Sequence, residues 1–274
     1  MTLPVRLIAT DIDGTLLSSR GVIPPDNLRA ILGAQRSGIT VAIASGRFPE
    51  NAYCLLQSYG LSCPIIGTNG GRIVDENLRL LAEHPMTPQA AMAVQAMLDE
   101  AGADYFAFGA KFVCSSNSAM RHHSELSDGE KIMTLGLSYR HGPEAARESC
   151  VHDAIYKFFV CNNVPFPPLR EALAKIGGIS LTQSGPHNIE VMPEHVDKGQ
   201  GIRELAALLN IPLSQVMTLG DQENDIPMLR AAGYSVAMGN ASPETKAAAR
   251  FVTDTNDQAG FARAIERFAL TSAV

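Results

Sequence analysis

One stretch decides the fold of this chain, the run VRLIATDIDGT at residues 5–15. Its apolar first half is typical of a buried strand, and the Asp-Gly pair that follows is typical of a turn. Asp11 and Asp13 stand two residues apart, so on an extended backbone both carboxylates lie on one face and point at one spot. Burying like charges so close together is costly unless a cation lies between them or one acid is protonated. The pair therefore predicts a metal or phosphate site, with a solvated turn as the alternative.

The segments around this strand alternate between strand and helix in both halves of the chain. Near-continuous apolar strands that alternate with helices indicate a parallel sheet covered on both faces. We therefore predict an α/β fold whose core is a Rossmann-like, doubly wound parallel sheet. Strands are expected at residues 5–12, 39–44, 63–67, 215–219 and 235–238, and helices at residues 26–36, 49–59, 198–209, 226–232 and 261–270.

The middle of the chain has a different pattern. A helix is expected at residues 88–100, followed by short aromatic strands near residues 105–113 and a polar stretch without a clear period. Further strands are expected at residues 154–161, 179–183 and 188–192, with a second helix between them. Two helices with several hairpin-linked strands indicate an α+β module. We expect residues 1–84 and 190–274 to form the core domain and residues 85–189 to form an inserted α+β cap domain.

Composition and charge argue against several classes of protein. The 274 residues are 46% hydrophobic, yet no apolar run reaches the roughly 18 residues that a membrane span needs, so no membrane partner is expected. The first apolar run is expected to be a strand and not a signal segment. Five scattered cysteines without a C-x-x-C pair are typical of reduced thiols, which favours a cytoplasmic location. The net charge of −6 and the lack of a basic run argue against a nucleic-acid partner but are compatible with a small anionic substrate.

Polar side chains gather where the core strands end. In open parallel sheets, ligands bind outside the carboxyl ends of the strands. A carboxylate about 4 Å from a phosphate dianion faces roughly 4 kcal/mol per charge pair at a dielectric near 20, which only a cation such as Mg²⁺, together with a lysine, offsets. A serine and an asparagine would add neutral hydrogen bonds to phosphoryl oxygens. The strand ends hold Asp11, Asp13, Ser45, Arg47, Asp221, Asn224 and Asp225, and Lys198 lies where the core pattern resumes.

The chain resembles the haloacid dehalogenase superfamily, and specifically the Cof-type phosphatases of subclass IIB with a large α/β cap. The resemblance spans the chain, with the least pattern in the cap, and four motifs in a fixed order are specific where any one alone is weak. These motifs are DIDGT at residues 11–15, SGR at 45–47, DKG at 197–199 and GDQEND at 220–225, with TNGG at 68–71 as a subgroup signature.

The resemblance implies a role for each matching residue. Asp11 would be the nucleophile that forms an aspartyl-phosphate, and Asp13 would be the general acid and then the general base. Mg²⁺ would be held by Asp11, the backbone carbonyl of Asp13 and Asp221, with Asp225 orienting Asp221 or a water on the metal. The phosphoryl group would be bound by Ser45, Lys198 and Asn224, and Arg47 would reach the substrate or make a surface ion pair.

The function expected from these motifs is a Mg²⁺-dependent phosphatase that hydrolyses phosphomonoesters of small metabolites, such as sugar phosphates. Two alternatives stay open. One is a sugar phosphomutase of the same superfamily, which would need the cap to exclude water. The other is a phospho-Asp receiver domain, which is disfavoured because such domains are much shorter and lack a cap. The expected partner is a small phosphorylated metabolite, and both a monomer and a dimer are compatible with the sequence.

Overall fold

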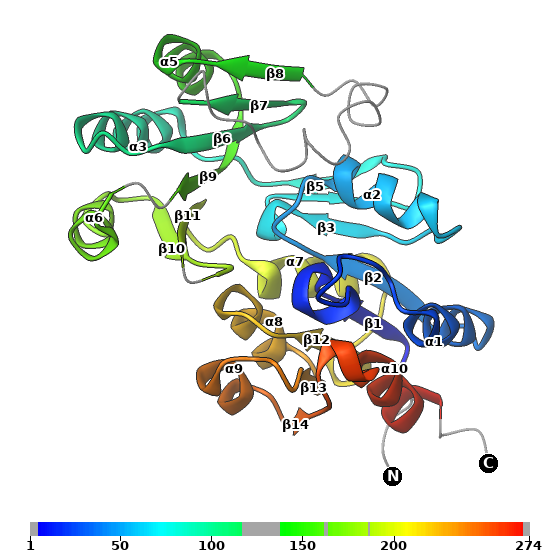
Figure 1. The fold of residues 1–274 in the computed structure, drawn as a ribbon. Coiled ribbons are helices and arrows are strands. Elements are labelled where there is room, and N and C mark those ends of the chain that lie inside the picture. Colours follow the sequence, from blue (N-terminus) through cyan, green and yellow to red (C-terminus); the bar gives the residue numbers. More distant parts are fainter. Residues whose placement is uncertain (1–4, 117–137, 162–163, 186, 271–274) are drawn as a thin grey trace. The chain divides into compact units, whose positions relative to one another are not determined.

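The computed structural model describes residues 5–116, 138–161, 164–185 and 187–270 (Figure 1). The chain divides into two compact units, Met1–Leu81 with Asp197–Val274, and Ala82–Val196. The predicted insertion, residues 85–189, lies inside the second unit, whose sheet continues beyond residue 189 in β11 (Asn188–Pro193). Within the described part of the chain, no helix has the length and apolar character needed to cross a membrane.

An eight-stranded sheet forms the first unit, in the order β14-β13-β12-β1-β2-β3-β4-β5. The neighbours from β14 to β3 run parallel, and β3 pairs with β4 antiparallel. Later strands are added on both sides of the central β1, which confirms the predicted α/β, doubly wound arrangement. The strands are β1 (Leu7–Thr10), β2 (Thr40–Ala44), β3 (Ile65–Gly67), β4 (Arg72–Val74), β5 (Leu80–Glu83), β12 (Val216–Gly220), β13 (Tyr234–Ala237) and β14 (Phe251–Val252).

Helices cover both faces of this sheet. Ile8 and Ile43 pack in one apolar cluster with residues of α1 and α10, such as Ile31 and Phe261. The opposite face receives α7, which approaches so closely that a Cβ on Gly201 would lie 2.4 Å from the Ile66 side chain. Burial on both faces explains why these strands are apolar throughout and not alternating. The helices are α1 (Pro25–Arg36), α2 (Pro49–Ser58), α7 (Lys198–Leu208), α8 (Ile226–Ala231), α9 (Pro243–Ala248) and α10 (Gly260–Ile265).

A six-stranded sheet forms the second unit, in the order β10-β11-β9-β6-β7-β8. Its helices share a core with alternate residues of the strands, including the edge-to-face pair of Tyr105 and Phe158 at 5.7 Å. The strands are β6 (Tyr105–Gly109), β7 (Phe112–Ser115), β8 (Ser138–His141), β9 (Ile155–Cys161), β10 (Ile179–Thr182) and β11, and the helices are α3 (Pro88–Glu100), α5 (Pro143–His152) and α6 (Phe166–Leu173).

Two features of this unit differ from the sequence expectation. The polar stretch after residue 113 contains β8 and α5, and β8 pairs with β7 in parallel, not through a hairpin. The buried residues of α5 are Ala146, Ser149 and Cys150, which are small or polar. A helix that buries such residues shows little hydrophobic periodicity, so the pattern did not reveal it.

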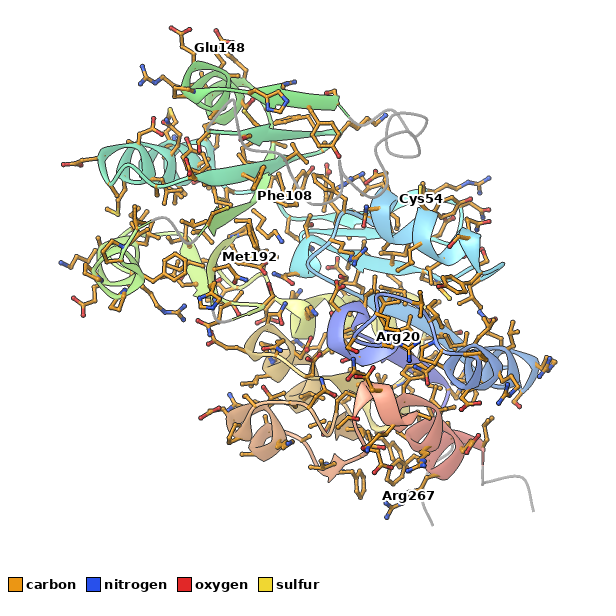
Figure 2. The ribbon with its side chains drawn as sticks, in the orientation of Figure 1. Arg20, Cys54, Phe108, Glu148, Met192 and Arg267 are labelled. Carbon is orange, nitrogen blue, oxygen red and sulfur yellow. The ribbon has the colours of Figure 1, made fainter. Side chains whose placement is uncertain are left out.

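The sheet of the second unit also holds a buried ion pair. Lys157 on β9 donates from Nζ to Glu190 Oε2 on β11 at 2.9 Å, and the two side chains are 3% and 1% exposed. The same Nζ lies 4.5 Å from the ring centroid of Phe108, which Figure 2 labels on β6. Phe108 and Lys157 are direct partners in the β6–β9 ladder, so the pair lies on the face opposite the Tyr105–Phe158 core.

Candidate active site

Asp11 lies directly after β1, at the carboxyl edge of the first unit's sheet. The strand ends at Thr10, although the sequence predicted that it continued to Ile12, and the chain turns through residues 12–16. Gly14 makes this turn with φ +83°, and a Cβ there would lie 2.3 Å from an oxygen of Asp221. Glycine is therefore required both by the backbone conformation and by the approach of the next loop.

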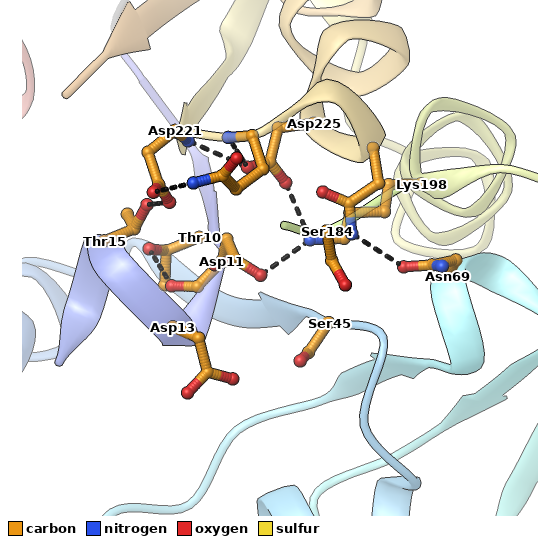
Figure 3. Close-up of polar contacts among 12 residues, drawn as sticks. Thr10, Asp11, Asp13, Thr15, Ser45, Asn69, Ser184, Lys198, Asp221 and Asp225 are labelled. Carbon is orange, nitrogen blue, oxygen red and sulfur yellow. Dashed lines mark hydrogen bonds and ion pairs between the residues drawn. The ribbon is translucent and has the colours of Figure 1, made fainter. Parts of the chain in front are cut away.

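Lys198 begins α7, and none of its side chain is exposed to solvent. Asp197 caps the helix by accepting a hydrogen bond from the backbone N–H of Gln200 at 2.7 Å. Lys198 Nζ donates to Asp11 Oδ1 at 2.6 Å and to Asp225 Oδ1 at 2.7 Å (Figure 3). One ammonium group thus joins carboxylates from the loops after β1 and β12.

Asp221 and Asp225 follow β12 and have different partners. Asp225 Oδ2 accepts from the backbone N–H groups of Asp221 at 2.8 Å and Gln222 at 3.0 Å. Asp221 Oδ1 accepts from the Thr15 hydroxyl at 2.8 Å. Its Oδ2 accepts from the side-chain amides of Gln222 at 3.1 Å and Asn240 at 3.3 Å. Asp225 is therefore tied to the backbone and to the lysine, whereas Asp221 is held by neutral side chains.

The buried charges of the site are not balanced. Burial raises the pKa of Asp11 well above its usual value; Lys198 opposes this rise, and Asp225 and Asp221 add to it. Burial, followed by the charge of Asp225, raises the pKa of Asp221 to about 6. Burial disfavours the charge of Lys198, but Asp11 and Asp225 hold the pKa of Lys198 above its usual range. Three carboxylates around one ammonium leave an excess of negative charge that a cation would compensate.

Asp11, Asp221 and Asp225 fit a divalent cation. Each offers one carboxylate oxygen, and these oxygens lie within 4.8 Å of one another. A donor set of hard oxygens suits Mg²⁺, whereas Zn²⁺ prefers nitrogen and sulfur. Asp225 is paired with the Lys198 ammonium and two backbone N–H groups, whereas the partners of Asp221 are all neutral side chains. Asp221 therefore keeps more of its charge for a cation, and Asp225 is better placed to orient than to bind directly.

Asp13 pairs with Arg47 and not with Lys198. Arg47 donates to it through Nε at 2.8 Å and Nη2 at 2.7 Å, and Nη1 donates to Asn51 Oδ1 at 3.1 Å. The Asp13 side chain is 58% exposed, against 8% for Asp11. Extended strand geometry predicted one shared target for the two carboxylates. They have different partners because the strand ends at Thr10 and the backbone between the two acids leaves the extended conformation at Ile12.

Ser45 and Asn224 are linked through Asn69. Ser45 is buried after β2, and its hydroxyl accepts from the backbone N–H of Arg47 at 3.2 Å. The backbone N–H of Asn69 donates to the Ser45 carbonyl at 2.9 Å, and the Asn224 amide donates to Asn69 Oδ1 at 3.2 Å. Asn69 takes φ +53°, the left-handed region that asparagine tolerates. The predicted phosphate-binding positions after β2 and β12 therefore share one polar network.

Sequence reasoning missed Asn240, which touches Asp221. It lies in the loop after β13, at the same edge of the parallel sheet. The rule that ligands bind at the carboxyl ends of parallel strands would have included it. The pair Gly239-Asn240 reads instead as an ordinary turn.

Comparison with known proteins gives consistent results. The family model described as haloacid dehalogenase-like hydrolase matches residues 8–265. The chain is 30% identical over 282 residues to the 5-amino-6-(5-phospho-D-ribitylamino)uracil phosphatase YwtE of Bacillus subtilis (strain 168), covering 96% of this chain and 98% of that protein. It is 30% identical over 268 residues to YcsE of the same organism, which has the same named activity, with 97% and 96% covered. A solved haloacid dehalogenase-like hydrolase from B. subtilis superposes with a TM-score of 0.83 at 27% identity, covering 96% of this chain and 99% of that one.

Proposed function

The chain belongs to the haloacid dehalogenase-like hydrolases and is a phosphomonoester hydrolase. We propose that it is a Mg²⁺-dependent phosphatase that forms an aspartyl-phosphate on Asp11. One observation carries the proposal. Lys198 Nζ contacts Asp11 Oδ1 at 2.6 Å inside a cluster of three buried acids. A buried nucleophilic carboxylate next to a fixed positive charge suits attack on a phosphate dianion, which would repel a bare carboxylate.

In the first half of the reaction, Asp11 attacks phosphorus. The bond from phosphorus to the ester oxygen breaks, and Asp13 gives its proton to the leaving alcohol. In the second half, Asp13 takes a proton from water, the water oxygen attacks phosphorus, and the bond to Asp11 breaks to release phosphate. Mg²⁺, held by Asp11, Asp221 and the backbone carbonyl of Asp13, would neutralise charge on the phosphoryl oxygens.

Arg47 can bind two anionic groups in this mechanism, the Asp13 carboxylate and the substrate phosphate. Its guanidinium holds both oxygens of Asp13, and the same planar fork binds a phosphate equally well. An incoming phosphate that takes over Arg47 would free Asp13 to face the leaving group. Ser45 and Asn224 would hold phosphoryl oxygens by neutral hydrogen bonds.

The names of two relatives support a proposal for the substrate class. Two curated relatives are named as phosphatases of 5-amino-6-(5-phospho-D-ribitylamino)uracil, an ester of a sugar alcohol with phosphate. We therefore propose that this chain acts on a phosphorylated polyol or sugar. That uracil derivative and several sugar phosphates are the first compounds to test.

The test measures phosphate release from this panel with Mg²⁺, using the intact protein, Asp11→Asn and Asp257→Asn. Asp257 is an exposed acid that accepts from the backbone N–H of Ser19, so Asp257→Asn serves as the matched control. We expect turnover in the intact protein and in the control, none with Asp11→Asn, and a phosphorylated peptide containing Asp11 after acid quenching. Turnover that survives Asp11→Asn, or a label on another residue, would contradict the assignment.

A further inference from the structure

Asn240 contacts two of the loops that form the site. Its Nδ2 donates to the Gly14 carbonyl at 2.9 Å and to Asp221 Oδ2 at 3.3 Å. Gly14 belongs to the turn after β1, and Asp221 to the loop after β12. Asn240 itself follows β13, so one side chain joins the ends of three strands.

The orientation of this amide is determined by its partners. Asn240 Oδ1 accepts from the backbone N–H of Asn256 at 3.0 Å. A backbone N–H only donates, so the oxygen must face Asn256 and the nitrogen must face the Gly14 carbonyl and the Asp221 carboxylate. All three contacts are consistent with this single orientation of the amide.

The backbone that carries Asn240 is also held tightly. Gly239 donates from its N–H to the Asp254 carbonyl at 2.9 Å. A Cβ on Gly239 would lie 2.7 Å from the backbone nitrogen of Thr255. The loop after β13 therefore packs against residues 253–255 at a distance that only glycine permits. This packing fixes the backbone position from which the Asn240 side chain extends.

From these contacts we infer that Asn240 is a positioning residue for the cation of the site. This inference rests on the proposed function, because it requires Mg²⁺ on Asp221. The hydrogen bond from Asn240 to Gly14 holds the turn that contains the Asp13 carbonyl, and the hydrogen bond to Asp221 holds its carboxylate. Asn240 therefore keeps in place two of the groups proposed to bind Mg²⁺. Partners of this kind are typically worth about 10–100-fold in metal affinity.

The neutral charge of Asn240 is part of the inference. Asp221 accepts from Thr15, Gln222 and Asn240, none of which is charged. A lysine at this point would hold the carboxylate equally well but would repel the cation. An amide orients Asp221 and leaves its negative charge available to the metal.

The test compares Asn240→Ala with Asn256→Ala in the full-length protein. Asn256→Ala removes the side-chain bond to the Leu17 carbonyl, 2.9 Å, but keeps the backbone N–H that contacts Asn240. It is therefore a matched amide deletion on the neighbouring segment after β14, and it leaves Asp221 with all of its donors. Mg²⁺ binding is measured by calorimetry without substrate, and thermal unfolding is measured without metal.

We expect Asn240→Ala to raise the Kd for Mg²⁺ about 10-fold and to lower the Tm of the metal-free protein by no more than Asn256→Ala does, because Asn240 is exposed and Asn256 is buried. Asn256→Ala should lower the Tm and leave the Kd unchanged. The inference is overturned if Asn240→Ala lowers the Tm while its Kd equals that of wild type. If the intact protein binds no Mg²⁺, both this inference and the metal dependence proposed above are overturned. If the intact protein binds Mg²⁺ and Asn240→Ala has the same Kd, only this inference is overturned.

Discussion

Asp225→Asn separates the effect of hydrogen bonds from the effect of charge at the site. The substitution keeps the shape of the side chain but supplies only one accepting oxygen. Asp225 uses one oxygen for Lys198 at 2.7 Å and the other for the backbone N–H groups of Asp221 and Gln222 at 2.8 and 3.0 Å. Whichever way the new amide turns, its nitrogen faces a donor. The variant therefore loses at least one bond and gains a donor–donor contact.

The charge terms nearly cancel. At a dielectric near 20, the attraction lost between Asp225 and Lys198 is about 6 kcal/mol. The repulsion removed between Asp225 and the other two acids, whose oxygens lie within 4.8 Å, is at least about 3 kcal/mol for each ionised acid. With both acids ionised, these terms have opposite signs and similar size, so the hydrogen bonds decide the result. A bond to a charged group contributes about 1.5–3 kcal/mol.

We expect Asp225→Asn to lose about 2 kcal/mol of unfolding free energy and to lower the Tm of the metal-free protein by about 4–8 °C. Thermal unfolding by circular dichroism measures this, with Asp257→Asn as a control that should leave the Tm unchanged. A Tm at or above that of wild type would refute the reasoning, because it would mean that relief of repulsion outweighs the lost hydrogen bonds.

Three further predictions concern the metal, the arginine and the turn. Saturating Mg²⁺, at about 100 times its Kd, should stabilise the protein by about 2.7 kcal/mol, and EDTA should reverse this stabilisation. In Asp221→Asn the thermal shift caused by Mg²⁺ should be lost. An equal shift in that variant would contradict the assignment of Asp221. Arg47→Ala should lower kcat/KM for phosphate release about 10–100-fold, as expected for a lost bond to a charged group. Its Tm should hardly change, because the Arg47 and Asp13 side chains are 29% and 58% exposed and such pairs contribute at most about 1 kcal/mol; unchanged kinetics would make Arg47 a surface ion pair. Gly14→Ala should lower both the Tm and kcat/KM, because its Cβ would lie 2.3 Å from Asp221. Gly21→Ala, also at positive φ but with nothing within 4 Å, should lose only the backbone cost of about 1–2 kcal/mol; equal effects of the two substitutions would argue against the Asp221 contact.

The sequence by itself determined the α/β class, the doubly wound sheet and the family. Apolar strands that alternate with helices leave few ways to bury both faces of a sheet, and the carboxyl ends of parallel strands meet at one edge. That rule predicted that Asp11, Lys198, Asp221 and Asp225 lie together, and they are in contact or within 4.8 Å of one another.

Only the tertiary structure decided which side chains meet. Strand periodicity predicted that Asp11 and Asp13 share a target. The backbone leaves the extended conformation at Ile12, so Asp11 contacts Lys198 and Asp13 contacts Arg47. The position of Asn240 after a core strand makes it a candidate, but its contact with Asp221 depends on how the loop after β13 packs against residues 253–255. Periodicity reports which face of an element is buried. It does not report the loop conformations and contacts between distant segments that set the partners of a polar side chain, and these arise only when the whole unit packs.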